Sequence, residues 1–278
     1  MKRVVVTGAG VVSSLGNDWA SFIANLKDGV SGIKVMAEWE CYADLNTRLG
    51  GPVLDFTPPA HCSRKKTRTM GRVSLMSTYA TETALQCAGL LGDPVLQSGR
   101  AGVAYGSSTG STDAVTDFGS MLVSGDMSGI TATTYIRMMG HTAPVNIGLY
   151  FGLKGRIIAT STACTSGSQG IGAAYEAIKY GRQTIMVAGG AEELCPTEAA
   201  VFDTLYATST RNDEPQLTPR PFDRDRDGLV IGEGAGTLVL EELEHALARG
   251  ATILAELVGY GTNSDGGHVT QPSPETMR

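Results

Sequence analysis

The sequence of 278 residues contains no hydrophobic stretch near the roughly 20 residues that a membrane span needs. An apolar run begins at Val4, but residues 7–10 interrupt it, and no signal-peptide cleavage pattern follows. The net charge of −6 argues against a nucleic-acid-binding protein, which would normally carry a basic face. We therefore expect a cytoplasmic protein with no membrane span and no nucleic-acid partner.

The five cysteines form no disulfide or metal-binding pattern. They are scattered, no Cys-x-x-Cys pair occurs, and none of the four histidines completes a zinc-ligand spacing. We expect neither a disulfide framework nor a bound metal. Any cysteine with special chemistry must be identified from its own neighbours.

Glycine, by contrast, is abundant: the chain has 36 glycines, roughly twice the average usage. They are dispersed along the sequence, which indicates tight turns and close backbone approaches rather than low complexity. Short β-branched runs alternate with helical patterns, and no linker separates domains. Continuous apolar strands with helices between them predict an α/β fold whose sheet is buried on both faces.

The expected strands cover residues 3–7, 101–105, 156–160, 184–188, 237–240 and 253–260. The expected helices cover residues 18–28, 72–88, 143–150, 167–180 and 243–249. Two polar, proline-containing segments, residues 36–68 and 208–226, are predicted to be surface loops or insertions.

Cys164 lies in the strongest local pattern, residues 156–172. An apolar run leads into small residues around Cys164, and a helical pattern follows. The positive end of a helix dipole and the unpaired N–H groups there favour a thiolate. Small neighbours let a substrate carbonyl approach, and the backbone N–H of Cys164 can help to hold an oxyanion. The alternative is a buried, unreactive cysteine, the commoner fate of a free thiol.

Residues 106–110 match Gly-x-Ser-x-Gly, the nucleophile signature of serine hydrolases, with Ser108 as the candidate nucleophile. His245 and His268 lie downstream as possible triad members. The helical pattern from Ser111 is weak, however, and short matches arise by chance in a chain rich in glycine and serine. A glycine-rich turn is the competing interpretation.

Three other patterns have ordinary explanations. Residues 223–228 begin like an EF-hand loop, but Gly234 stands where the ligating Glu belongs, so we predict a salt-bridged turn. Residues 7–13 resemble the start of a dinucleotide fingerprint without its third glycine, and we expect no NAD. The basic run at residues 64–68 is either a solvated patch or a dock for an acidic partner.

Several segments in order resemble the β-ketoacyl-acyl-carrier-protein synthases of type II, condensing enzymes of the thiolase superfamily. Residues 162–167, Thr-Ala-Cys-Thr-Ser-Gly, are similar to the nucleophile motif of that family. Residues 187–192, Val-Ala-Gly-Gly-Ala-Glu, resemble the strand that follows it. Further similar segments are residues 4–16, 209–213, 220–223, 227–236, 241–261 and 265–272.

The resemblance implies a thiolase-like fold with α-β-α-β-α layers. Residues 1–250 would form the first half, and residues 251–278 would begin a second half that the sequence truncates. It also implies a 3-oxoacyl-[acyl-carrier-protein] synthase of fatty-acid, polyene or polyketide synthesis. Cys164 would accept an acyl group, and malonyl carrier protein would then condense with it and lose CO₂. No dissociable cofactor is expected.

The resemblance further implies an acyl-carrier-protein partner and a homodimer or synthase heterodimer. Lys65, Lys66 and Arg68 would meet the acidic carrier protein, and Thr270 would lie near its pantetheine arm. His268, in a polar loop after an expected strand, is a further candidate for substrate binding.

Two positions of the acyl pocket depart from the family pattern. Thr109 falls where the family tends to carry an aliphatic residue at the pocket floor. Thr134 falls where the partner subunit usually supplies an aromatic residue. We therefore expect a substrate other than a plain saturated chain, such as an unsaturated or aryl-primed one.

Another departure concerns the reaction. The two histidines and the phenylalanine loop that the family uses in its second half do not follow Cys164 here. We predict that these 278 residues accept an acyl group at most, and that they belong to a longer enzyme. The main alternative is a non-catalytic subunit similar to a chain-length factor, although such subunits lack the nucleophile.

Overall fold

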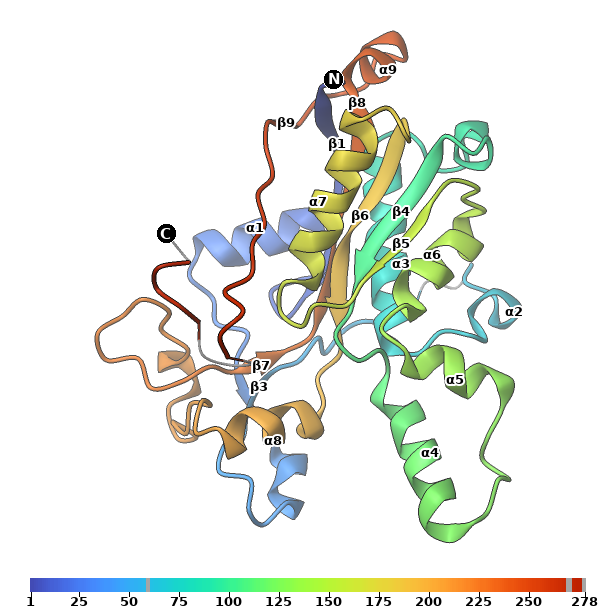
Figure 1. The fold of residues 1–278 in the computed structure, drawn as a ribbon. Coiled ribbons are helices and arrows are strands. Elements are labelled where there is room, and N and C mark those ends of the chain that lie inside the picture. Colours follow the sequence, from blue (N-terminus) through green and yellow to red (C-terminus); the bar gives the residue numbers. More distant parts are fainter. Residues whose placement is uncertain (59–60, 269–271, 277–278) are drawn as a thin grey trace.

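The computed structural model describes residues 1–58, 61–268 and 272–276 (Figure 1). Its strands are β1 (Val4–Ser13), β2 (Lys34–Val35), β3 (Leu49–Gly51), β4 (Ala101–Gly106), β5 (Ile157–Thr160), β6 (Ile185–Glu192), β7 (Ile231–Gly232), β8 (Gly234–Glu242) and β9 (Ala255–Leu257). Its α-helices are α1 (Trp19–Lys27), α2 (Arg64–Thr67), α3 (Arg72–Cys87), α4 (Thr112–Ser124), α5 (Ala132–Met138), α6 (Thr142–Phe151), α7 (Ser166–Lys179), α8 (Pro196–Thr204) and α9 (Leu243–Ala248).

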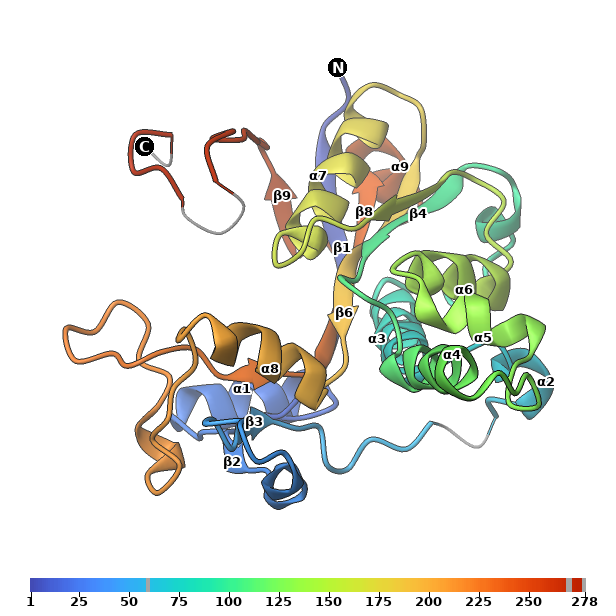
Figure 2. The ribbon, with the colours of Figure 1, turned by 60° about the horizontal axis from the view of Figure 1, so that its bottom comes forward.

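The main sheet has six strands in the order β5-β4-β6-β8-β1-β9. Strand β4 runs parallel to β5 and β6, whereas β8 is antiparallel to β6 and β1. A small second sheet has the order β2-β3-β7. Figure 2 shows β2 and β3 beside α1 and α8, away from the main sheet.

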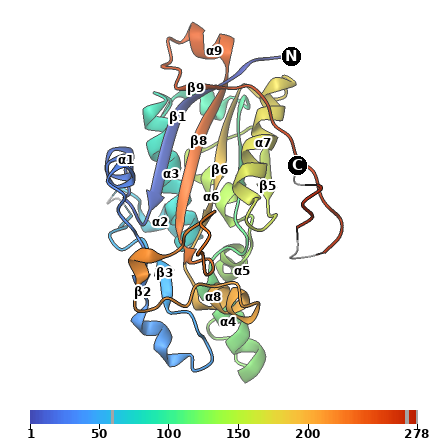
Figure 3. The ribbon, with the colours of Figure 1, turned by 90° about the vertical axis from the view of Figure 1, so that its left-hand side faces the viewer.

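Helices cover both faces of the main sheet, which confirms the predicted α/β fold. Figure 3 shows α3 and α7 on opposite sides of β1, β8 and β6. One hydrophobic core lies between the sheet and α3 with α6, and includes Met76, Ile147 and Val187. A second lies between the sheet and α7, and includes Ile178 and Met186. Burial on both faces explains why the central strands are continuous apolar runs.

Strand β1 is longer than the predicted strand at residues 3–7, because it continues through residues 8–13. A Cβ atom on Gly8 would overlap the carbonyl oxygen of Ala84, and one on Gly10 would overlap that of Ala80. The glycines therefore let α3 lie directly on the strand. This close packing also explains the Gly-x-Gly pattern without a dinucleotide.

Strand β9 is shorter than the predicted strand at residues 253–260 and pairs with Val4–Val6 of β1 at the sheet edge. The predicted division of the chain after residue 250 stays a prediction. No helix in the described part of the chain is long and apolar enough to cross a membrane.

The segment at residues 36–68 is more ordered than the predicted loop, with a 3₁₀ helix, β3 and α2 within it. Trp39 is only 2% exposed and packs with Met36, Leu45 and Ala199.

Three further helices were not predicted from the sequence: α4, α5 and α8. The loop prediction for residues 208–226 is confirmed apart from the 3₁₀ turn Pro215–Leu217.

Candidate active site

The carboxyl ends of three neighbouring strands lie side by side. Gly106 at the end of β4 aligns with Thr160 of β5 and with Gly190 of β6. In open α/β sheets, ligands bind just outside the carboxyl ends of the strands. The residues that follow these ends are therefore the first candidates for a site.

Cys164 lies in the turn between β5 and α7. The residue before it, Ala163, has a φ of 51°, in the left-handed region that residues with a side chain rarely adopt. Ser166 holds the turn: its hydroxyl accepts from the N–H of Thr162 at 2.9 Å and donates to the carbonyl of Ala163 at 2.6 Å. Strained backbone of this kind persists only where its surroundings impose it, and it often marks functional sites.

Glycines let the first turn of α7 approach the strand ends. A Cβ atom on Gly106 would lie 2.5 Å from the Cβ of Ser166, and one on Gly190 would lie 2.8 Å from the Cα of Gly167. This packing fixes where Cys164 projects. The Cys164 side chain is exposed, so this cysteine is not buried as the alternative interpretation supposed, and its reactivity stays a prediction.

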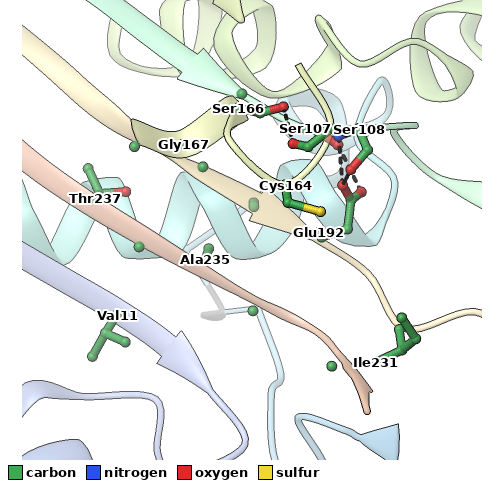
Figure 4. A pocket seen from close by; sticks show the side chains of 18 of the residues that line it. Val11, Ser107, Ser108, Cys164, Ser166, Gly167, Glu192, Ile231, Ala235 and Thr237 are labelled. Carbon is green, nitrogen blue, oxygen red and sulfur yellow. Dashed lines mark hydrogen bonds between the residues drawn. The ribbon is translucent and has the colours of Figure 1, made fainter. Parts of the chain in front are cut away.

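A carboxylate beside Cys164 is held by three donors (Figure 4). Glu192, the last residue of β6, accepts from the Ser107 hydroxyl at 3.0 Å and from the Ser108 N–H at 2.6 Å. The Ser108 hydroxyl also donates to it. Glu192 thus ties the turn after β4 to the end of β6. Glu192 lies in a segment that resembles the family, and no role was predicted for it from the sequence.

Cys164 borders a cavity of about 950 Å³. Its wall is mostly apolar or glycine, and it runs from the strand ends to α1 and α8. Among the residues that line it are Ser107, Ser108, Thr109, Cys164, Glu192, Glu198, Val201, Phe202, Val230 and Ile231.

Glu198, on α8, is the unexpected member of this lining. The Thr109 hydroxyl donates to its carboxyl at 3.3 Å. Burial raises the pKa of Glu198 to about 7, and the nearby charge of Glu192 adds to the effect. No sequence signal marked Glu198, because α8 was not predicted and the residue lies 34 positions beyond Cys164.

Of the other residues predicted to bind substrate, Thr109 lines the cavity and Thr134 does not. Thr134 is buried in α5, where its hydroxyl accepts from the N–H of Thr131 at 3.1 Å and caps the helix. His268 is exposed and lies outside the described lining of the cavity. Thr270 falls outside the described residues. The roles predicted for all four stay predictions.

The basic residues Lys65, Lys66 and Arg68 are exposed on and just after α2. Lys66 Nζ lies 5.0 Å from the ring centroid of Tyr150. None of the three makes an ion pair with a described residue. They form an exposed cationic surface, as either interpretation of the run requires.

The predicted Ser108 hydrolase site is not assembled with His245. A helix, α4, does follow the motif, contrary to expectation, because Gly110 at φ 76° turns the chain into it. His245 is nevertheless bonded to Glu241, which pairs with Ile185 at the opposite end of β6 from the Ser108 side. The Ser108 hydroxyl is bonded to Glu192 instead.

The calcium-like pattern forms a salt-bridged turn, as predicted: the Asp225 N–H donates to Asp223 at 2.7 Å, and Arg224 pairs with Asp225 at 3.3 Å.

One group of possible metal ligands occurs among the described residues, namely His61, Cys62 and Glu82, whose ligand atoms lie within 4.8 Å of one another. His61 Nε2 lies 2.7 Å from a carboxyl oxygen of Glu82, within hydrogen-bond distance.

Comparison with known proteins gives consistent results. Residues 1–246 match the family model of the beta-ketoacyl synthase N-terminal domain. Over 277 residues the chain is 40% identical to 3-oxoacyl-[acyl-carrier-protein] synthase 2 of Vibrio harveyi, covering 99% of this chain and 66% of that protein. It matches the crystal structure of a beta-ketoacyl synthase from Burkholderia phymatum STM815 with a TM-score of 0.97 and 59% identity, covering 100% of this chain and 68% of that one.

The structure of the ishigamide ketosynthase/chain length factor matches with a TM-score of 0.82 and 30% identity, covering 96% of this chain and 65% of that one. The chain thus spans about two thirds of the length of the relatives it matches. Its fold is the thiolase-like α/β half that the resemblance implied. The chain belongs to the beta-ketoacyl synthase family, whose N-terminal domain it carries.

Proposed function

We propose that the natural protein containing this chain is a 3-oxoacyl-[acyl-carrier-protein] synthase in which Cys164 accepts the acyl group. The observation that carries the proposal is the exposed Cys164 thiol on a strained turn, between the N-terminus of α7 and a large cavity. The relative from Vibrio harveyi has the same activity in its name.

In the first step, the Cys164 thiolate attacks the carbonyl carbon of an acyl thioester. A new carbon–sulfur bond forms, the carbon–sulfur bond to the carrier breaks, and the carrier leaves as a thiol after taking up a proton. The Cys164 N–H, at the N-terminus of α7, supports the oxyanion that forms in this step.

In the second step, malonyl carrier protein loses CO₂, and the resulting carbanion attacks the acyl carbon. A carbon–carbon bond forms and the bond to Cys164 sulfur breaks. No histidine is among the described residues that line the cavity. We therefore assign acyl transfer to this chain's own residues, and the condensation to the whole natural protein.

The proposed partner is an acyl carrier protein, which would dock on Lys65, Lys66 and Arg68. A homodimer or a heterodimer with a second synthase chain is the proposed assembly. The match to a ketosynthase/chain length factor also keeps a non-catalytic subunit as the competing function.

Incubation with an isotopically labelled acyl-CoA, followed by peptide mass mapping, tests this proposal. We expect label on Cys164 and its loss in Cys164→Ser. Cys87→Ser, which changes another exposed cysteine, should keep the label. Label on Ser108 would instead identify a hydrolase, and a wild-type protein that takes no label would indicate a non-catalytic subunit.

A further inference from the structure

The cavity beside Cys164 contains an acid that the condensation chemistry does not use. Glu198 lines this cavity together with Val201 and Phe202 of the same helix. Across from them, Val230 and Ile231 also border the space. A carboxyl group among apolar side chains is costly unless it finds hydrogen-bond partners.

The two neighbouring acids are already satisfied. Glu192 accepts from Ser107 and Ser108, as described above. Glu193 accepts from the N–H of Thr112 at 2.6 Å and from its hydroxyl at 2.7 Å. Each of these carboxylates has a structural task, namely to hold the turns after β4 and β6.

Glu198 is different. Among the described residues its carboxyl has a single hydrogen bond, the 3.3 Å bond from Thr109, and that hydroxyl also lies 3.4 Å from the carbonyl of Gly110. No described cation forms an ion pair with Glu198. A carboxyl group can make about four hydrogen bonds, so most of the capacity of Glu198 is unused.

The protonation state of Glu198 suits a neutral partner. With its pKa raised to about 7, the group is present in both forms near neutral pH. It can therefore accept a hydrogen bond as a carboxylate or donate one as an acid. An ammonium group would have to lose far more hydration to enter a cavity with this apolar lining than a hydroxyl group would.

We propose that Glu198 selects acyl chains that carry a hydroxyl group, which bonds to its carboxyl with Thr109 alongside. The substrate class is a hydroxyacyl thioester, and the proposal rests on the proposed role of Cys164 as acyl acceptor. A plain hydrocarbon chain would bury the Glu198 carboxyl without a partner. A site with a buried polar group discriminates strongly against a ligand that leaves the group unpaired.

The test uses the full-length natural protein and medium-chain acyl-CoA thioesters, each paired with its ω-hydroxy counterpart. The rate of Cys164 acylation is measured by mass spectrometry for both members of each pair. Wild type should prefer the hydroxyacyl member of at least one pair by about tenfold, as a hydrogen bond to an ionisable group allows. Glu198→Leu should reverse the preference, and Glu198→Gln, which keeps the shape and a donor, should retain part of it.

Glu244→Leu serves as the control, because Glu244 is an exposed acid on α9. It should leave the preference as in wild type. Equal rates for both members of every pair would overturn the proposal, as would a preference that survives in Glu198→Leu. If Glu198→Leu fails to fold, the preference of Glu198→Gln is measured at pH 6 and pH 8. A preference equal to that of wild type at both pH values overturns the proposal. If both members of each pair acylate Cys164 at equal rates, the selectivity proposed for Glu198 is wrong and the proposed function of Cys164 stands. If neither member acylates Cys164, the proposed function is wrong as well.

Discussion

At the scale of single residues, Glu241 is a carboxylate that needs hydrogen-bond partners because it is buried. Its side chain is fully buried at the end of β8. Arg249 binds both carboxylate oxygens at 2.7 Å, the Thr7 hydroxyl donates at 3.0 Å, and His245 is a further partner. Burial alone would raise the pKa of Glu241, but these hydrogen bonds outweigh it and hold the pKa below its ordinary value.

Arg249→Ala should therefore destabilise the protein by about 3 kcal/mol at pH 7, because it leaves a buried carboxylate without its cation. A depressed carboxyl pKa stabilises the fold above the ordinary pKa of Glu, and the contribution is lost as the pH falls through the folded value. The deficit of the variant should thus shrink below about pH 4. Urea unfolding across this pH range measures it.

Arg224→Ala is the matched control. Arg224 is 92% exposed and pairs with the 60% exposed Asp225, so its loss should change the unfolding free energy by less than about 1 kcal/mol. Equal effects of the two substitutions would contradict the assignment of Glu241 as a buried ionic centre.

At the scale of elements, the contact between β1 and α3 depends on glycine. Gly10→Ala would push a methyl group into the carbonyl oxygen of Ala80, and neither backbone can yield without opening the core. We expect a destabilisation of about 3 kcal/mol, at the upper end for an overpacked core. Thermal unfolding of the purified variant measures it.

Gly119→Ala makes the same chemical change on α4, where a Cβ atom meets nothing within 4 Å. It should stabilise the protein by up to about 1 kcal/mol, since alanine favours a helix interior over glycine. A Gly10→Ala protein as stable as wild type would show that α3 does not lie directly on the strand.

The helices show what local patterns can and cannot predict. The sequence prediction for α3, residues 72–88, ends one residue from the observed end at Cys87, because its apolar positions recur at helical spacing. The helices α4 and α8 were missed. In α4, Thr and Gly lower the helical propensity, and α8 follows a strand end with little apolar periodicity.

At the scale of the whole molecule, charge is unevenly distributed. The chain has a net charge of −6, yet α2 presents Lys65 and Lys66 to solvent. If this surface binds an acidic carrier protein, Lys65→Glu with Lys66→Glu should weaken binding by roughly tenfold or more, through like-charge repulsion. The loss should diminish as salt is added. Titration calorimetry at two salt concentrations measures both effects.

Lys27→Glu with Lys34→Glu gives the same change in net charge on exposed residues of α1 and β2. Figure 1 shows α1 and α2 on opposite sides of the molecule. This control should bind the carrier protein like wild type. If both double variants lose affinity equally, net charge rather than the α2 surface governs the interaction.

The sequence by itself determined the features that neighbouring residues encode. Apolar runs and helical spacing predicted the α/β fold, and the small residues around Cys164 predicted an accessible thiol at a strand-to-helix turn. Propensity and side-chain size act over a few residues, so these signals are readable without a structure.

Only the tertiary structure decided which distant residues share a site. It brought Glu192 and Glu198 to the cavity beside Cys164, and it placed Arg249 against the buried Glu241. It also placed His245 at the opposite end of β6 from Ser108, so these two residues do not form a hydrolase site together. The reason is physical: burial, hydrogen-bond partners and raised or lowered pKa values arise when segments far apart in the sequence pack together, and no local pattern encodes that packing.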